Sequence, residues 1–260
     1  MSYITIPRFY AYRACSNTYC FFRLPSAITY DEGALIEPLA VAVHACRRAV
    51  ITPGSTALVL GAGAVGQLCA VAARMAGCTK IAIADIDAGR VKWAIDNGFA
   101  EIGHVVPMKR AASGEESLML AKDLAQDLGS LTWPDGSPTR RFSNTFECTG
   151  VPSCVQSSIY ATKSGGKVLL VGMGTPNYTL PISEVSAREI DLIPTWRYAD
   201  CYGRAIEIMA ACQSDPKLPQ VSKMVTHQFS GLDGTFNAFE TAGKTRDAAG
   251  ELVMKVAVHL

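Results

Sequence analysis

Short apolar runs alternate with longer amphipathic segments through the middle of the chain. The runs are rich in β-branched and small apolar residues, which is typical of buried strands, whereas the segments between them have the spacing of helices. Strands that alternate with helices predict an α/β fold with a parallel sheet. We expect a doubly wound sheet of six strands, over 57–60, 80–84, 104–106, 142–148, 167–174 and 189–194.

The segments between these strands predict the helices and loops that connect them. We expect helices over 67–76, 87–97, 115–128 and 152–162, and a further helix that begins near Thr29 and runs to Arg48. Proline and glycine are dense over 133–141, which predicts an exposed loop, and Ser164–Gly166 predicts a turn.

The two ends of the chain do not follow this alternation. Residues 1–30 are aromatic and irregular, and they need a surface to pack on. The C-terminal part predicts a helix over 203–212, a strand over 224–229, a short helix over 232–241 and a final strand over 251–258. Because these elements lie outside the doubly wound pattern, we expect three segments: 1–40, a sheet domain over 41–195, and 196–260.

Glycines follow the first predicted strand at the spacing of a dinucleotide-binding turn. The run Ala57–Leu60 leads into Gly61, Gly63 and Gly66, in the pattern G-x-G-x-x-G, and a helix follows at once. The first glycine permits the tight turn, the second lets the backbone approach a pyrophosphate, and the third lets the helix pack close to the strand. The amide groups at the start of that helix can hold the anion.

The second strand ends in an acid, as a ribose-binding unit requires. Asp85 follows the last glycine by about twenty residues, where a carboxylate accepts hydrogen bonds from the ribose hydroxyls and repels a 2′-phosphate. We therefore expect NAD rather than NADP. The alternative is that Asp85 only caps the helix that starts near Asp87. Arg90, on that helix, is placed to reach the adenosine end of the cofactor.

The end of the fifth strand also carries glycines. Ligands of open parallel sheets bind at the carboxyl ends of the strands, and small residues at Gly172 and Gly174 would let a nicotinamide lie against the backbone. The alternative is that these glycines serve the turn for steric reasons alone.

Two side chains near residue 40 are candidates for a polar role. Glu37 lies inside an apolar segment, and since an isolated buried carboxylate is costly, it is either paired or functional. His44 is better interpreted as a histidine of the core than as a ligand.

Cys15 and Cys20 have no second pair at a suitable spacing, so we interpret them as structural or incidental thiols and expect no metal site there.

The composition narrows the class of protein. A chain of 260 residues with 49% apolar residues can bury a core, and its 24 basic and 23 acidic side chains nearly cancel. Such a balance favours neither nucleic acid nor a membrane surface as partner. The nine cysteines form no regular framework and no run reaches membrane-spanning length, so we expect a soluble cytoplasmic protein with reduced thiols that binds a small molecule.

Several co-linear motifs resemble the sorbitol and xylitol (polyol) dehydrogenase branch of the zinc-containing medium-chain dehydrogenases. The motifs are Glu32–Leu39, His44–Arg48, Glu147–Gly150, Ser164–Gly166, Trp196–Tyr198, Val225–His227 and Ala238–Thr241. The resemblance runs from about residue 20 to the end. It implies a Rossmann domain that binds NAD, and a GroES-like catalytic domain to which 1–40 and 196–260 would belong.

The resemblance also implies a role for individual residues. Glu37 would lie beside the catalytic zinc, and Arg197 and Tyr198 would face the polyol. The cofactor contacts would be Gly61, Gly63, Val65, Gly66, Asp85, Arg90, Thr149, Val171, Gly172, Met173, Thr195, Trp196 and Arg197. The family mechanism passes a hydride from a secondary alcohol to the nicotinamide and yields a ketose. Tetrameric relatives imply a homo-oligomer.

The zinc ligands of this family have no counterpart in the sequence. They include a cysteine and an adjacent His-Glu pair upstream of the motif around Glu37, and no His-Glu dipeptide occurs in the chain. One carboxylate cannot hold catalytic zinc, which needs three protein ligands. We therefore expect an N-terminally truncated member of the family, without a metal site of its own. Two hypotheses follow: a zinc-assisted polyol dehydrogenase, or an inactive NAD-binding remnant.

Overall fold

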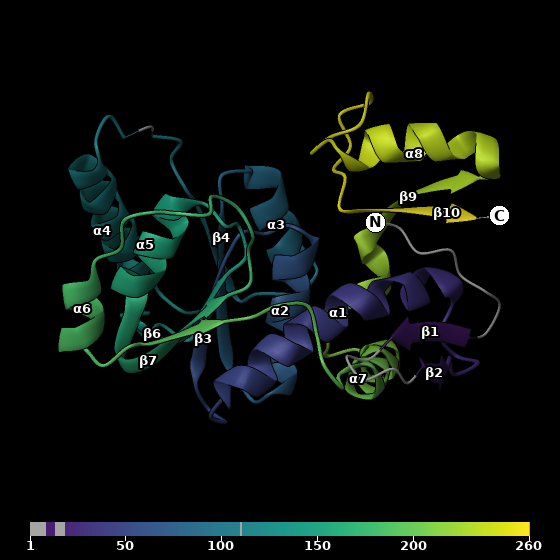
Figure 1. Ribbon diagram of the computed structural model, residues 1–260, viewed down its shortest axis with the longest axis horizontal. Coiled ribbons are helices and arrows are strands. Elements are labelled where there is room, and N and C mark those ends of the chain that lie inside the picture. The colour runs from purple at the N-terminus through teal and green to yellow at the C-terminus, as the bar shows by residue number, and fades with distance from the viewer. Residues whose placement is uncertain (1–8, 14–18, 110, 260) are drawn as a thin grey trace. The chain divides into compact units, whose positions relative to one another are not determined.

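A computed structural model of the chain describes residues 9–13, 19–109 and 111–259, with the backbone alone described over 9–13 and 19–21 (Figure 1). The chain divides into two compact units. The sheet unit is Ala42–Tyr198, and the flanking unit combines Met1–Val41 with Ala199–Leu260. The first long helix, α1 (Tyr30–Ala49), begins in the flanking unit and ends in the sheet unit.

Six parallel strands form the sheet unit, which confirms the predicted sheet. They are β3 (Thr56–Leu60), β4 (Lys80–Asp85), β5 (Ile102–Val105), β6 (Phe142–Glu147), β7 (Thr162–Leu170) and β8 (Asp191–Pro194). Their order is β5-β4-β3-β6-β7-β8. This is the doubly wound order, in which the chain reverses direction across the sheet between β3 and β6.

Helices cover both faces of this sheet. They are α2 (Ala64–Met75), α3 (Ala88–Asp96), α4 (Gly114–Ser130), α5 (Pro152–Ala161) and α6 (Ile182–Ala187). Figure 1 shows α2 and α3 on one side of the strands and α4 and α5 on the other. The central strands are therefore apolar on both faces: Leu58, Val59 and Ile81 are 0% exposed.

The segment 133–141 is a loop, as its composition predicts, and most of its residues are exposed, but two of its side chains are buried. Trp133 is 3% exposed and meets the ring of Phe142 edge-on, with centroids 6.2 Å apart. Thr139 is also buried, and its hydroxyl donates to the carbonyl of Leu128 at 2.8 Å. Proline and glycine set the exposed turn, whereas the indole of Trp133 fills the space beside α4 and belongs to the core.

Strand β7 differs from the prediction at both of its ends. β7 already begins at Thr162, so the expected turn at Ser164–Gly166 lies within a strand whose register against β6 shifts after Phe142. The strand ends at Leu170 and not at Gly174. The short helix α6 was not predicted, because six residues are too few to show helical periodicity.

The flanking unit contains two small sheets. β1 (Phe9–Arg13) pairs with β2 (Tyr19–Arg23) in antiparallel fashion, so the prediction that residues 1–30 are irregular is wrong there. β9 (Val225–Ser230) pairs in parallel with β10 (Lys255–His259). The other elements are α7 (Tyr202–Ser214), the 3-10 turns η1 (Val221–Met224) and η2 (Leu232–Gly234), and α8 (Thr235–Ala242).

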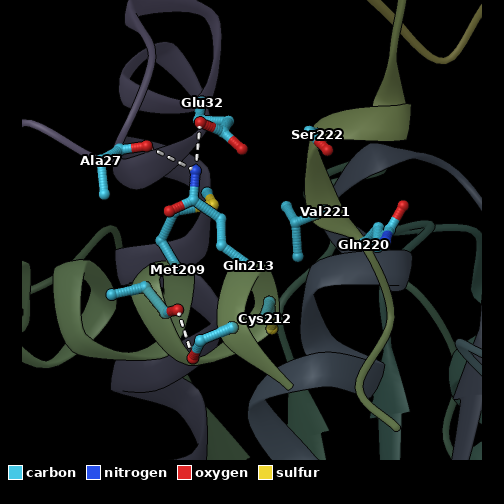
Figure 2. Close-up of a pocket in the computed structure, with 10 residues that line it drawn as sticks. Ala27, Glu32, Met209, Cys212, Gln213, Gln220, Val221 and Ser222 are labelled. Atoms are coloured by element: carbon cyan, nitrogen blue, oxygen red, sulfur yellow. Dashed lines mark hydrogen bonds between the residues drawn. The ribbon is translucent and has the colours of Figure 1, made fainter. Parts of the chain in front are cut away.

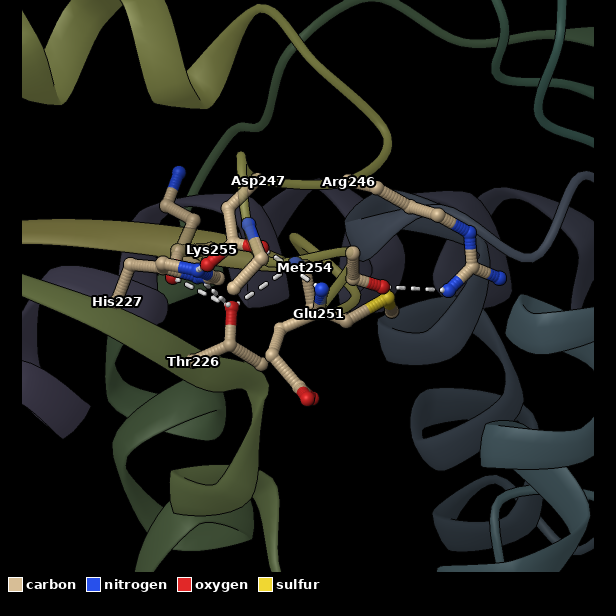
Figure 3. A network of polar contacts seen from close by, with 9 residues as sticks. Thr226, His227, Arg246, Asp247, Glu251, Met254 and Lys255 are labelled. Atoms are coloured by element: carbon tan, nitrogen blue, oxygen red, sulfur yellow. Dashed lines mark hydrogen bonds and ion pairs between the residues drawn. The ribbon is translucent and has the colours of Figure 1, made fainter.

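The final strand begins four residues later than predicted because a polar network holds the preceding loop (Figure 3). Asp247 accepts hydrogen bonds from the amides of Ala249 and Glu251 and lies 3.3 Å from Nε2 of His227. The Glu251 amide and the His227 ring hold the pKa of Asp247 below its ordinary value.

Within the described part of the chain, none of the helices has the length and apolar character needed to cross a membrane.

Candidate functional site

The glycine turn joins β3 to α2 at the carboxyl edge of the sheet. Gly61 has a φ of +100°, which a residue with a side chain rarely adopts. A Cβ at Gly66 would lie 1.8 Å from the carbonyl oxygen of Gly61, so only glycine lets α2 approach the turn this closely. Both glycines therefore have a structural reason to be where the motif places them.

Gly63 differs from these two glycines because a Cβ at this position would clash with no neighbouring atom. It is the N-cap of α2, and neither a side-chain cap nor an acidic residue occupies the first turn of this helix. A Cβ at Gly63 would have as its nearest neighbour the Nη1 of Arg90, at 3.9 Å. The free amides of the helix terminus and the guanidinium thus border the same space, which suits an anion.

Arg90 has an unsatisfied donor at this point. Its Nε is buried and has no hydrogen-bond partner among the described residues, although a buried donor normally has one. The backbone amide of Arg90 is satisfied, because it donates to the side chain of Asp87 at 3.0 Å. An orphaned guanidinium donor beside an open glycine turn fits a bound phosphate or a nucleotide base.

Asp85 binds the glycine turn and does not cap the next helix. Its Oδ2 accepts from the amide of Ala62 at 2.6 Å, and its Oδ1 accepts from the amide of Asp87 at 2.9 Å. The N-cap of α3 is Asp87. The alternative interpretation of Asp85 is therefore wrong, and the carboxylate stands at the edge of the sheet beside the turn.

The second half of the edge is built around Glu147, the last residue of β6. Its side chain accepts hydrogen bonds from the amide and hydroxyl of Thr149 and from the amide of Gly150. Its own carbonyl accepts from the amides of Val171 at 2.9 Å and Gly172 at 2.8 Å. Glu147 begins the motif Glu147–Gly150, but no role was predicted for its side chain; the signal was an acid at the end of a largely buried strand.

The glycines of these two loops pack backbone against backbone. A Cβ at Gly172 would lie 2.2 Å from the amide nitrogen of Gly150, and a Cβ at Gly174 would lie 2.1 Å from the carbonyl oxygen of Gly150. Gly150 itself has a φ of +71°. The steric explanation of the glycines after β7 is therefore sufficient, whatever else binds beside them.

The loops also meet the first glycine turn. A Cβ at Gly61 would lie 2.9 Å from Cγ2 of Thr149. The structure thus brings together Gly61, Gly63, Gly66, Asp85, Arg90 and Thr149 at the point where the sheet reverses. Val65 and Val171 are half-buried there, and Met173 is 73% exposed.

Three residues after β8 were predicted to contact the cofactor or the substrate: Trp196 and Arg197 are exposed, and Tyr198 is buried. Thr195 donates through its amide and its hydroxyl to the carbonyl of Leu170, both at 3.0 Å, which continues the edge of the sheet. Trp196 is 65% exposed, and the guanidinium of Arg197 lies 5.7 Å from the centre of its ring. Tyr198 is buried.

The two glutamates of α1 differ in their partners. Glu32 is buried and forms a capping box with Thr29, whose amide and hydroxyl both donate to it at 2.8 Å. Glu37 is half-buried, and within the described residues its carboxylate has no hydrogen bond or ion pair. Of the two alternatives for Glu37, pairing has no support in the structure.

The flanking unit contains a cavity of about 550 Å³ lined by residues of α1, α7 and η1 (Figure 2). Its polar groups are used structurally: Gln213 donates to Glu32 at 2.6 Å and to the carbonyl of Ala27 at 3.0 Å. Burial raises the pKa of Cys212, on its wall, to about 11, which keeps the thiol protonated. We assign no ligand to this cavity.

No metal centre is formed by the residues that the structure describes, since no three His, Cys, Asp or Glu side chains converge to hold an ion. The cysteines whose side chains are described form no disulfide with one another, and Cys15 together with the side chain of Cys20 lies outside the described residues. Burial, with Arg47 and Arg48, lowers the pKa of half-buried His44. Because no three ligand side chains converge, catalytic zinc does not fit the described residues, whereas a dinucleotide fits those at the glycine turn.

The strand order and the glycine turn at the reversal point define a doubly wound, Rossmann-type α/β domain. Within that class, the chain belongs to the zinc-binding dehydrogenase family, whose model matches residues 64–211, more than half of the chain. The predicted membership of the zinc-containing dehydrogenases is confirmed.

Individual proteins agree with this assignment. The sorbitol dehydrogenase of Gallus gallus is 36% identical over 229 residues, which cover 87% of this chain and 57% of the relative. That of Bos taurus is 36% identical over 237 residues, covering 91% and 59%. The crystal structure of L-idonate 5-dehydrogenase from Escherichia coli has the same fold, with a TM-score of 0.71 at 20% identity over 92% of this chain and 60% of that one. The chain thus spans less than two thirds of the length of these relatives.

Proposed function

We propose that the chain is an NAD-dependent oxidoreductase that oxidises a polyol of the sorbitol or xylitol type to a ketose. The observation that carries the cofactor assignment is the position of Asp85, whose carboxylate is fixed to the glycine turn at the edge of the sheet. A carboxylate there accepts the ribose hydroxyls and repels a 2′-phosphate. The sorbitol dehydrogenases among the relatives support the substrate class.

The residues divide the proposed cofactor site into two halves. The open space at Gly63, with the α2 terminus and Arg90, would hold the pyrophosphate, and Gly61, Val65, Gly66 and Asp85 would complete the adenosine half. The remaining proposed contacts would border the nicotinamide: Thr149, Val171, Gly172, Met173, Thr195, Trp196 and Arg197.

The bound cofactor supplies a hydride acceptor. Around it, the chain would exclude water by the close packing of the loops after β6 and β7, and orient the nicotinamide through their backbone groups. We assign Glu37, Arg197 and Tyr198 to the polyol, and the carboxylate of Glu37 has no hydrogen bond or ion pair with another described residue. Among the described residues, no three side chains converge to supply the ligands that a catalytic zinc needs.

A second candidate function is that of an NAD-binding protein without dehydrogenase activity. The lack of three converging metal ligands among the described residues favours it. The two are separated by following NADH formation with sorbitol and with xylitol, with and without a zinc chelator. Turnover supports the oxidoreductase, and binding of NAD without turnover supports the second candidate. The same proposal includes a GroES-like fold for 1–40 and 196–260, and assembly into a tetramer. Light scattering tests the tetramer.

The first prediction concerns the choice of cofactor. Replacing Asp85→Ser together with Ile86→Arg removes the repulsion of a 2′-phosphate and adds a cation for it, and Ile86 is 58% exposed and has room for the longer side chain. We expect the ratio of NADP to NAD affinity to rise at least tenfold, about 1.4 kcal/mol. Isothermal titration with each dinucleotide measures it.

A matched control places the same charge on α3, away from the glycine turn. Ile95→Arg adds a guanidinium at a residue that is 40% exposed, near the other end of the helix. It should leave the ratio unchanged. An unchanged ratio in the double variant would mean that Asp85 does not face the ribose, and the cofactor assignment would have to be abandoned.

A further inference from the structure

Glu147 is a buried carboxylate to which the proposed function gives no part. It is 1% exposed, and no Lys, Arg or His side chain pairs with it among the described residues. Burying an uncompensated charge is costly unless hydrogen bonds stabilise it. Here the stabilisation comes from the amide of Thr149 at 2.8 Å, the hydroxyl of Thr149, and the amide of Gly150, which reaches both carboxylate oxygens at 3.0 and 3.1 Å.

Glu147 fixes two loops and not one. Its side chain determines the path of Thr149 and Gly150, and its main-chain carbonyl accepts from Val171 and Gly172 at the end of β7. The two loops then touch through glycine backbone atoms, so that a displacement of one must displace the other. A carboxylate that accepts several hydrogen bonds in a buried position is a rigid anchor.

The position of this anchor is specific. Glu147 pairs with Leu60 on one side and with Leu170 on the other, and both are last residues of their strands. It therefore stands at the point where the strand order reverses, on the edge at which open parallel sheets bind ligands. The loops that it holds are those assigned above to the nicotinamide, whereas Gly63, Asp85 and Arg90 lie on the other half.

We propose, on the basis of the proposed function, that Glu147 is a positioning residue for the nicotinamide half of the cofactor site. It does not touch the cofactor. It holds Thr149–Gly150 and Val171–Gly172 so that their backbone groups face the nicotinamide in one arrangement. Its loss should weaken the contacts of that half alone.

The test compares NAD with ADP-ribose, which lacks the nicotinamide, by isothermal titration of the full chain. Glu147→Gln keeps the size of the side chain but turns an amide NH₂ toward backbone N–H donors. We expect NAD to bind about tenfold more weakly and ADP-ribose to change by less than about twofold. A role in stability alone would weaken both ligands equally or neither.

A matched control is Glu101→Gln. This glutamate also accepts a backbone amide in the sheet, that of Ile81 at 2.6 Å, but it lies at the amino edge and pairs with Arg74. It should leave the ratio of the two affinities unchanged. Should Glu147→Gln not fold, Glu147→Asp serves instead, since it keeps the charge and withdraws the carboxylate by one methylene, and we expect a selective loss of NAD affinity of about threefold.

The outcomes separate the two proposals. If the wild-type chain binds neither NAD nor ADP-ribose, the proposed function is wrong and the positioning role is overturned with it. If it binds both, but the variants of Glu147 leave the ratio unchanged, only the positioning role is overturned. A selective loss of NAD affinity supports it.

Discussion

The two halves of the sheet edge differ in the space that their loops leave beside the backbone. Around β3 and β4, the turn leaves open space at Gly63, bordered by a helix terminus and a guanidinium with an unsatisfied donor. Around β6 and β7, the space beside Gly150 and Gly172 is already filled by neighbouring backbone. The first half is shaped to admit an anion, and the second to lock two loops together.

This difference shows that a glycine-rich segment does not by itself indicate a ligand contact. The acids at the two halves behave in parallel ways, however. Asp85 ends β4 and accepts the amides of Ala62 and Asp87, and Glu147 ends β6 and accepts those of Thr149 and Gly150. In each half a carboxylate, rather than a glycine, fixes the loop.

The largest effect is expected where a methyl group would meet backbone. Gly66→Ala would place its Cβ 1.8 Å from the Gly61 oxygen, and Gly172→Ala would place its Cβ 2.2 Å from the Gly150 nitrogen. Because backbone cannot move aside cheaply, each should lower the free energy of unfolding by about 3 kcal/mol. Urea denaturation followed by circular dichroism measures it.

Gly114→Ala is the control for these variants, because nothing lies within 4 Å of its Cβ position and the residue is helical. It should be neutral or stabilising by up to about 1 kcal/mol. If Gly172→Ala proved as harmless as this control, the backbone contact between the two loops would be wrong.

A smaller effect on stability, but a large one on binding, is expected at Gly63. Its φ of −75° and ψ of −176° suit any residue, and its surroundings are open, so Gly63→Ala should change the free energy of unfolding by less than about 0.5 kcal/mol. The methyl group would stand where the pyrophosphate approaches, so both NAD and ADP-ribose should bind at least tenfold more weakly. Undiminished binding would contradict the phosphate site.

A pH-dependent effect is expected in the loop after β6. The hydrogen bond with Cys69, burial and the charge of Glu147 raise the pKa of the Cys148 thiol well above its ordinary value. The unfolded chain loses this proton at a lower pH than the native chain, so the free energy of unfolding falls as the pH rises past about 8.5. The slope is at most about 1.4 kcal/mol per pH unit.

Cys148→Ala removes this thiol and should make the alkaline loss of stability shallower. Urea midpoints of both proteins at pH 8 and pH 10, under reducing conditions, measure the difference. Equal slopes would show that the native thiol titrates like that of the unfolded chain, and the environment derived for it would be incorrect.

Local patterns predicted most of the sheet unit. The apolar runs around Val59, Ile83 and Val168 became strands in the doubly wound order, and the glycine motif became the turn between β3 and α2. Such features depend on residues near one another in sequence, where hydrophobic periodicity and backbone freedom act directly. The roles assigned to the site residues remain predictions.

Features that depend on distant residues were not predictable in the same way. Trp133 lies in a segment of loop composition and is buried because Phe142 and α4 offer it a surface. β9 and β10 pair in parallel although about 25 residues separate them, with α8 between them. The partners of Glu147 come from two loops that meet only after the sheet has formed.

The alternation of strands and helices, the glycine turn and the acid that ends β4 could all be predicted from the sequence, because each is encoded by neighbouring residues. The folded chain was needed to show that Asp85 binds the turn instead of capping α3, that the glycines after β7 face backbone, and that Glu147 contacts two loops. The physical reason is that buried polar groups must find partners, and which partners are within reach depends on the assembled sheet.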